Sequence, residues 1–189
     1  TRYCCPLTFV KVKAQLYRTL ASIRPGIGFF DVAGAYDKAV AAHGAVCAKW
    51  RRLYRETVEK TEGVHVVLLG RPYTVFSEEM NKGIPGILGA LGIKAFYQDM
   101  LDADGQSVGA IEPLLKEIHW HHAAKILAAA AVVARTRGAY PVFLTSFKCS
   151  PDSFIIDYFR KIMEAHAKPY LILQLDEHDS RVGYETRIE

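Results

Sequence analysis

The stretch that decides the fold is FLTSFKCSPDSF, residues 143–154. An apolar run typical of a strand ends at Cys149, and a helix start follows at once, with Ser150 as a good N-cap and Pro151 suited to the first helical position. A thiol just before a helix N-terminus is favoured as a thiolate, and Lys148 adds a nearby positive charge. This setting favours a reactive or metal-bound Cys149. The alternative is a small buried hydrophobe at the end of a strand.

Three further short apolar runs resemble this strand, and helical patterns separate them. Strands alternating with helices predict βαβ units, in which a parallel sheet is covered on both faces. The sequence therefore predicts an α/β fold with about four parallel strands. The expected strands are residues 64–69, 93–97, 142–147 and 170–175, and the expected helices between them are residues 77–91, 111–136 and 151–167.

The first third of the chain has a different pattern. Residues 7–23 mix apolar and basic residues at helical spacing, the sequence RPGIG at 24–28 breaks the run, and Asp31 can cap a second helix that reaches about residue 60. We therefore expect a helical N-terminal segment over residues 1–62 and an α/β domain over residues 63–189. The ends suggest one fragment of a larger protein.

In an open parallel sheet, ligands bind outside the carboxyl ends of the strands. The short motifs that carry chemistry follow those ends, so we expect Gly70, Arg71, Asp99, Cys149 and Asp176 to gather at one edge. A guanidinium there can bind a phosphate or carboxylate in bidentate fashion. The alternative for Arg71 is an ion pair with a carboxylate such as Asp99 or Asp176.

Composition excludes several classes of function. The chain has 189 residues, of which 50% are apolar and 23% charged, which is typical of a soluble globular protein. Its net charge of +4 is spread along the chain and does not argue for nucleic acid. No apolar run is long enough for a membrane span, and no signal peptide opens the sequence. Four cysteines are too few for a disulfide framework, so a cytoplasmic setting is expected.

The other candidate ligands are weaker. Either Cys4 or Cys5, before Pro6, can offer a second thiol near a helix start, whereas Cys47 is expected to pack in a core. We expect Cys149 and one of the N-terminal pair to approach the same surface, with no disulfide to Cys47. The sequence HWHH at 119–122 puts two histidines one helical turn apart, but no cysteine or carboxylate accompanies them and zinc is not favoured. Three ionisable groups, at residues 176–178, end the last strand.

Three segments resemble the 2-hydroxyacyl-CoA dehydratase superfamily, and most closely the dehydratase-like portion of the large activators of 2-hydroxyglutaryl-CoA dehydratase, the CoA-enzyme activases. These segments are LLGRPYTVFSEEMNKGIPGIL, SFKCSPDSFIIDYF and KPYLILQLDEHDSRVGYETRIE, and CCPLT near the start matches a cysteine-proline element of that portion. The resemblance covers nearly the whole chain. Its most specific pieces are the cysteine-x-proline-aspartate motif and the tail with Asp-Glu-His and Thr-Arg.

The resemblance implies a three-layer Rossmann-like or flavodoxin-like domain, cysteine-ligated 4Fe-4S clusters and ATP-driven electron transfer at low potential. Carried over by residue, Cys149 matches a cluster cysteine, as does Cys5 (or Cys4). Arg71, Asp176 and His178 are the expected cofactor-binding residues. The expected partners are an ATPase activase domain or subunit and other dehydratase-like subunits.

Two departures limit what is carried over. The glycine usual after the cluster cysteine is Ser150 here, and a full set of three or four well-placed cysteines is absent. The motifs of the actin-like ATPase are absent too, so ATP hydrolysis is not assigned to this chain.

Three functions follow from the sequence. The leading one is an iron–sulfur electron-transfer domain of a dehydratase and activator system, which would belong to a lyase system. The second is a scaffold or partner-docking domain without a cluster. The third is a thiol enzyme with Cys149 as nucleophile and His178 as base, which requires the two side chains to lie within hydrogen-bond reach.

Overall fold

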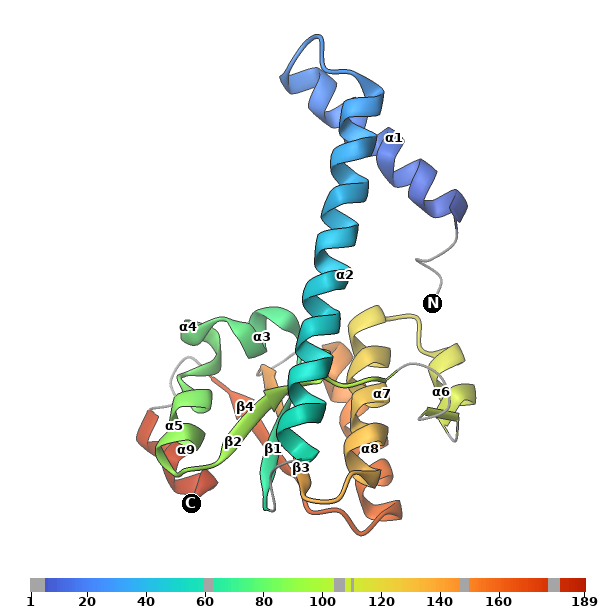
Figure 1. The fold of residues 1–189 in the computed structure, drawn as a ribbon. Helices are drawn as coiled ribbons and strands as arrows, with labels where there is room; N and C mark the ends of the chain where they lie inside the picture. The colour runs from blue at the N-terminus through green and yellow to red at the C-terminus, as the bar shows by residue number, and fades with distance from the viewer. Residues whose placement is uncertain (1–5, 60–62, 104–107, 110, 147–149, 177–180) are drawn as a thin grey trace. The chain divides into compact units, whose positions relative to one another are not determined.

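The computed structural model describes the chain except for residues 1–5, 60–62, 104–107, 110, 147–149 and 177–180 (Figure 1). The chain divides into two compact units, Thr1–Lys49 and Trp50–Glu189, and the boundary falls inside one long helix. The sequence predicts a different boundary, after residue 62, where the helical pattern gives way to the first strand. That boundary stays a prediction.

Unit 1 contains helix α1, Pro6–Ile23, and most of helix α2, Phe29–Glu59. The turn between the helices includes Gly26, whose φ of 89° is the left-handed conformation that glycine adopts without strain. Near the turn, the rings of Tyr17 and Phe29 meet edge to face with centroids 5.6 Å apart. The unit is therefore a helical hairpin, as the periodicity predicts.

Unit 2 contains the end of α2 and an α/β domain. Its strands are β1 His65–Gly70, β2 Lys94–Tyr97, β3 Ala139–Ser146 and β4 Leu171–Leu175. Its helices are α3 Pro72–Phe76, α4 Glu78–Asn81, α5 Ile84–Ala90, the 3₁₀ helix η2 Gln98–Met100, α6 Glu112–Glu117, α7 His121–Arg135, α8 Ser150–Ala165 and α9 Arg181–Ile188.

The four strands form one sheet in the order β2-β1-β3-β4, and every neighbouring pair is parallel. The predicted Rossmann-like class is confirmed, and the strands lie where the apolar runs predict them. The chain crosses from β1 to β2 on one side and then to β3 on the other side of β1. The carboxyl ends of β1 and β3 therefore flank the topological switch point, which is where open α/β sheets bind ligands.

The helical patterns are divided. The pattern at 77–91 is two short helices, one of the two outcomes that the Gly and Pro of NKGIPG (81–86) predict, because Lys82 and Gly83 both have left-handed conformations between them. The buried side chain of Asn81 holds this turn, donating to the carbonyl of Val75 at 2.9 Å and accepting from the amide of Gly83 at 2.9 Å. The pattern at 111–136 is also divided, into α6 and α7, and α9 was not predicted.

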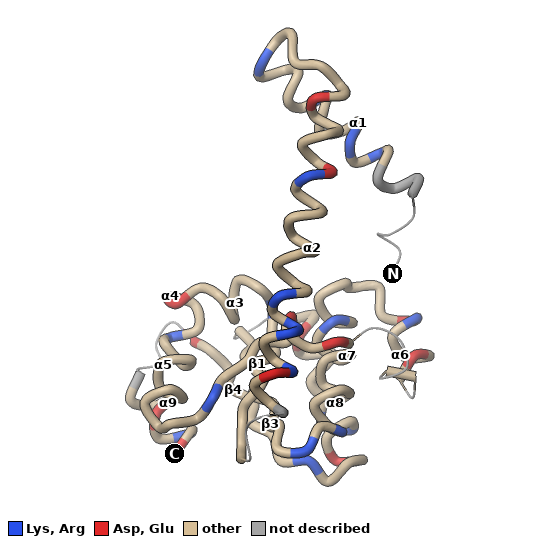
Figure 2. The backbone as a smooth tube through the Cα atoms, in the orientation of Figure 1, with Lys and Arg blue, Asp and Glu red and all other residues tan. Residues whose placement is uncertain are grey.

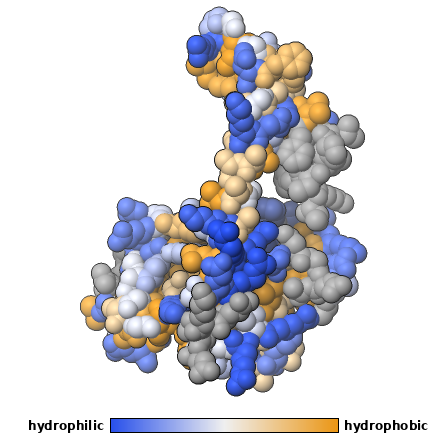
Figure 3. Space-filling view, viewed as in Figure 1, coloured by the Kyte–Doolittle hydropathy of each residue, from blue (hydrophilic) through white to orange (hydrophobic). Residues whose placement is uncertain are grey.

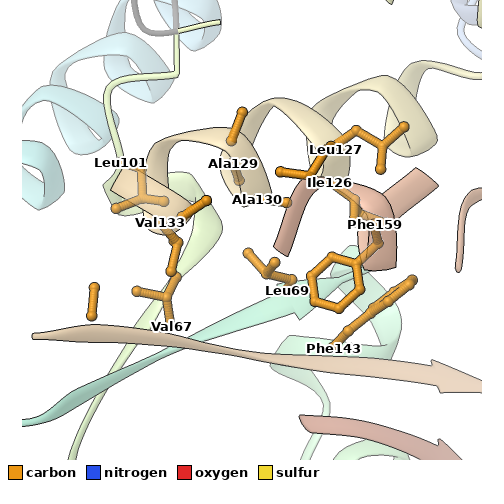
Figure 4. Close-up of a cluster of buried hydrophobic side chains, with 14 of the residues drawn as sticks. Val67, Leu69, Leu101, Ile126, Leu127, Ala129, Ala130, Val133, Phe143 and Phe159 are labelled. Atoms are coloured by element: carbon orange, nitrogen blue, oxygen red, sulfur yellow. The ribbon is translucent and has the colours of Figure 1, made fainter. Parts of the chain in front are cut away.

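The sheet separates two hydrophobic cores because alternate side chains of a strand point to opposite faces. On one face, Val67 and Leu69 of β1 and Phe143 of β3 meet α7 and α8 (Figure 4). The rings of Phe143 and Phe159 lie 5.4 Å apart in this core. Burial of each such side chain contributes about 1.5–3 kcal/mol.

On the other face, Val66 and Leu68 of β1 pack against α3, α5 and α9. Tyr184 of α9 is fully buried in this core and its hydroxyl accepts the amide of Asp176 at 3.3 Å. The last helix is therefore part of the second core. Its short length and its polar composition left no helical signal to recognise.

Gly70 ends β1 with a φ of 155°, in the positive region that side chains rarely adopt. A Cβ at this position would lie 2.6 Å from the carbonyl oxygen of Leu144 and 2.8 Å from the side chain of Val75. Only glycine allows β1 to turn into α3 while β3 passes this close.

The end of α2 joins the sheet through a buried aromatic cluster. Tyr54, His65 and Phe96 meet edge to face, with ring centroids 5.0–5.8 Å apart. The hydroxyl of Tyr54 and Nε2 of His65 form a hydrogen bond of 3.2 Å. Burial lowers the pKa of His65 from its ordinary value, and the positive charges of Lys168 and Lys94 lower it further. Burial also raises the pKa of Tyr54 to about 12.

We predict that Gly70→Ala destabilises the domain by about 2 kcal/mol or more, because it combines backbone strain with a clash against backbone. Gly89→Ala is the matched control, since a Cβ at this helical position meets nothing within 4 Å. It is expected to stabilise the domain by up to about 1 kcal/mol. Urea denaturation followed by circular dichroism measures both changes, and equal stabilities for the two variants would contradict this account of Gly70.

We predict that unfolding becomes easier as the pH falls from about 7 to 5. The folded state lowers the pKa of His65 below its ordinary value near 6.5, so as the pH falls past that value the unfolded chain binds a proton more readily than the folded chain does. The stability is therefore fully present above that value and is lost below it. His65→Gln should flatten the profile in part, because burial and neighbouring charges also lower the pKa of His121.

The measurement is the urea midpoint at a series of pH values. His119→Gln, which removes an exposed histidine, is the control and should leave the profile of the parent unchanged. A profile for His65→Gln as steep as that of the parent would show that His65 is not the group responsible.

Candidate functional site at the carboxyl edge of the sheet

The carboxyl edge of the sheet gathers the motifs that follow the strands. Gly70 ends β1 and Arg71 follows it, Asp99 follows β2, and Asp176 follows β4. All four strands are parallel, so their carboxyl ends lie at one edge of the sheet (Figure 1). The four residues therefore belong to that edge. Cys4, Cys5, Cys149 and His178 lie outside the described residues, so their predicted roles stay predictions.

Arg71 pairs with a carboxylate that the sequence did not indicate. Its Nε donates to Oδ1 of Asp152, in the first turn of α8, at 2.8 Å. The hydroxyl of Thr145, near the end of β3, donates to Oδ2 of the same carboxylate at 3.1 Å. The side chains of Arg71 and Asp152 are only 14% and 1% exposed. The three residues form a buried network that joins β1, β3 and α8.

The position of the network follows from strand alternation. Leu69, Arg71 and Thr145 all point toward the face that α8 covers, and there Asp152 also complements the positive end of that helix. Asp99, one of the two partners weighed for Arg71 from sequence, accepts from the side chain of Lys125 instead. The other, Asp176, donates its backbone amide to the hydroxyl of Tyr184.

Gln98 extends the sheet at this edge after β2 has ended. Its side-chain amide donates to the carbonyl of Gly70 at 2.8 Å and accepts the amide of Gly70 at 3.1 Å. It therefore satisfies both backbone groups of the last residue of β1. Gln98 is buried, and no sequence motif distinguishes it from an ordinary loop residue.

Two buried hydroxyls lie at the same edge. Within the described part of the chain, Oγ1 of Thr74 in α3 and Oγ of Ser146 at the end of β3 have no hydrogen-bond partner. Buried hydroxyls usually bind a protein group, a water molecule or a ligand. The two hydroxyls can donate or accept hydrogen bonds at this edge, where Arg71 and Asp152 pair with each other.

An aromatic pair flanks the start of α8. Trp120, just before α7, stacks on Phe154 with ring centroids 5.8 Å apart and an interplanar angle of 27°. Both side chains are about half exposed or more. The rings of His121 and His122 meet beside them at 5.3 Å. The sequence drew attention only to the histidines of this segment, and no motif marked the stacked pair.

The described residues do not form a metal centre of their own. In these ranges, no group of three or more His, Cys, Asp or Glu side chains comes together as ligands. Cys47 is the one cysteine described, and it lies 3.6 Å from Nε2 of His43 on the same helix. No helix in the part of the chain that the structure describes is long and apolar enough to cross a membrane.

Comparison with known sequences gives one family. The sequence model for the CoA enzyme activase uncharacterised domain (DUF2229) matches residues 2–101, which is more than half of the chain. The match includes Cys4, Cys5, Gly70 and Arg71, whereas Cys149 and Asp152 lie beyond it. No curated protein and no solved structure matches the chain.

We predict that Arg71→Met destabilises the domain by about 3–5 kcal/mol, because it leaves the buried carboxylate of Asp152 without its cation. Arg160→Met is the matched control, since Arg160 pairs with Asp157 at the surface at 3.6 Å. Its loss is expected to cost at most about 1 kcal/mol. Chemical denaturation of both variants tests the difference, and an equally small effect at the two sites would show that the buried pair does not stabilise this edge.

Proposed function

We propose that this chain, which belongs to the family of the CoA enzyme activase uncharacterised domain, is an iron–sulfur electron-transfer domain of a CoA-enzyme activase and dehydratase system. Membership of this family supports a role in a CoA-enzyme activase and dehydratase system. The cluster is the finer part of the proposal, and Cys149 with Cys5 (or Cys4) would supply its thiolates from this chain.

The observation that carries the proposal is the topology of β3 and α8, the two elements on either side of Cys149 in the sequence. The end of β3 at Ser146 and the start of α8 at Ser150 bracket residues 147–149 in the sequence, and β3 borders the topological switch point of the sheet. A cysteine in this segment follows the carboxyl end of a central strand, where α/β sheets present ligands. It also precedes the positive end of a helix of 16 residues, which stabilises a thiolate.

The described neighbours fit an anionic group in part. Arg71 brings a cation to this edge, and the hydroxyls of Thr74 and Ser146 can donate hydrogen bonds. Such outer-shell donors and charges tune the potential of a cluster. An iron–sulfur cluster, when bound, would supply one-electron transfer, while the protein would hold the thiolates and limit the access of water.

The donor set of this chain is incomplete for a 4Fe-4S cluster, which ordinarily takes four cysteines. The sequence offers four in total, of which Cys4 and Cys5 are adjacent and Cys47 lies in the middle of α2. The proposal therefore requires further ligands from a second chain or from another part of a longer protein. An ATPase activase domain and dehydratase-like subunits are the proposed partners, in a cytoplasmic setting that keeps the thiols reduced.

A scaffold or partner-docking domain without a cluster is the second candidate. The buried network of Arg71, Asp152 and Thr145 favours it, because the opposite charges of Arg71 and Asp152 pair with each other and hold β1, β3 and α8 together. The thiol-enzyme alternative requires Cys149 and His178 to meet, and both lie outside the described residues.

Reconstitution with iron and sulfide under argon tests the leading proposal. We expect the parent to bind iron and to absorb visible light through sulfur-to-iron charge transfer. Cys149→Ala should bind much less iron, and so should one of Cys4→Ala and Cys5→Ala, because each change removes a thiolate ligand.

Cys47→Ala is the matched control, and its iron content should equal that of the parent. Equal iron in the parent and in Cys149→Ala would remove the cluster and leave the scaffold as the better account. Circular dichroism of each variant checks that the fold is intact.

A further inference from the structure

Unit 1 has almost no core of its own. Among its described side chains, residues 10–49, Val32 is the only buried hydrophobic one. Besides the edge-to-face contact of Tyr17 and Phe29, polar contacts of Lys13 tie the hairpin: its ammonium pairs with Asp37 and lies 5.7 Å from the ring centroid of Tyr36. Two helices with so little burial do not offset the conformational entropy lost on folding.

The middle of α2 is exposed on every side although it is apolar. Each residue from 38 to 46 is exposed, and no Asp, Glu, Lys or Arg occurs between Lys38 and Lys49 (Figure 2). Val40 and Val46 are 44% and 45% exposed and lie on different sides of the helix. A helix that is apolar all round is normally covered by neighbouring elements.

Larger apolar side chains are exposed in the rest of the hairpin. Phe30, at the start of α2, is 86% exposed, and Ile23, at the end of α1, is 73% exposed. Val10 and Leu16 of α1 are exposed as well. The surface of unit 1 is therefore rich in apolar groups (Figure 3), as expected of a hairpin that forms an interface.

We propose that unit 1 is a dimerisation hairpin, in which α2 packs antiparallel against α2 of a second copy of this chain. Two hairpins together make four helices, and this is the smallest common arrangement in which every helix buries an apolar stripe. Because the exposed residues of α2 lie all round the helix, a partner that brings two helices covers more of them than a single helix does.

Charge complementarity points to a second copy and fixes its direction. Asp31 and Lys49 lie 18 positions apart in the sequence, which is five helical turns, so they share one face of α2. An antiparallel pair whose register is centred at position 40 places Asp31 of each copy opposite Lys49 of the other, while Val40 itself lies on the opposite face of the helix. A parallel pair in register would instead place Asp31 opposite Asp31 and Lys49 opposite Lys49 of the other copy. Lys38, the other charge on this face, lies opposite Ala42 in the antiparallel arrangement.

Charge reversal tests the proposal in the full chain by sedimentation equilibrium. The parent should be a dimer. Asp31→Lys brings the introduced lysine against Lys49 of the other copy, twice in each dimer, and Lys49→Glu likewise places two acidic pairs together. Each variant should weaken the dimerisation constant by about tenfold or more.

Mixing the two variants is the decisive step. In a mixed dimer, every reversed charge faces an opposite one, so a 1:1 mixture should regain the dimerisation constant of the parent, and native mass spectrometry should find the mixed species. Lys161→Glu, an exposed position on α8, is the control for net charge and should dimerise like the parent.

Circular dichroism must show equal helix content in all the chains. Asp31 lies in the first turn of α2, where its negative charge also stabilises the helix through the helix dipole. If Asp31→Lys loses helix content, the result for Lys49→Glu decides the test. A parent that is monomeric throughout the concentration range would overturn the proposal. So would variants that dimerise as tightly as the parent, or a mixture no tighter than its components.

Discussion

The α/β unit depends on one buried ion pair at the topological switch point. Arg71 follows the first strand and Asp152 begins the helix after the third, so their contact joins segments far apart in the chain. Thr145 adds a hydrogen bond from the third strand itself. A buried ion pair gives little net stability compared with apolar residues, but it tolerates only one arrangement of its partners. Its role here is to fix where the carboxyl edge of the sheet lies relative to α8.

That constraint places the segment of greatest chemical interest. In the sequence, Cys149 lies between the end of β3 at Ser146 and the start of α8 at Ser150, two residues before Asp152. The described residues on either side bring the start of α8, the cation of Arg71 and the buried hydroxyls of Thr74 and Ser146 to the carboxyl edge of the sheet. The same network also explains why a scaffold is the alternative, because Arg71 and Asp152 neutralise each other's charge without a cofactor. The cluster proposal and the scaffold proposal differ in whether the thiolates of this chain bind iron.

Sequence predicted the four strands and their edge because apolar runs, glycine and helix caps are local signals. The position of Arg71 at that edge followed from the same pattern. Its partner did not, because the choice among Asp99, Asp152 and Asp176 depends on which face of the sheet each segment covers. Gln98 was missed for a similar reason, since a side chain that replaces a strand residue has no motif. The cluster of Tyr54, His65 and Phe96 likewise exists only after α2 meets the sheet.

The central claim is that Cys149 holds an iron–sulfur cluster at the switch point. Anomalous diffraction at the iron edge, from crystals of reconstituted protein grown under argon, tests it most directly. The account predicts an anomalous peak outside the carboxyl ends of β1 and β3, within bonding distance of the sulfur of Cys149. An iron peak elsewhere in the molecule, or none in crystals that show an ordered Cys149, would contradict it.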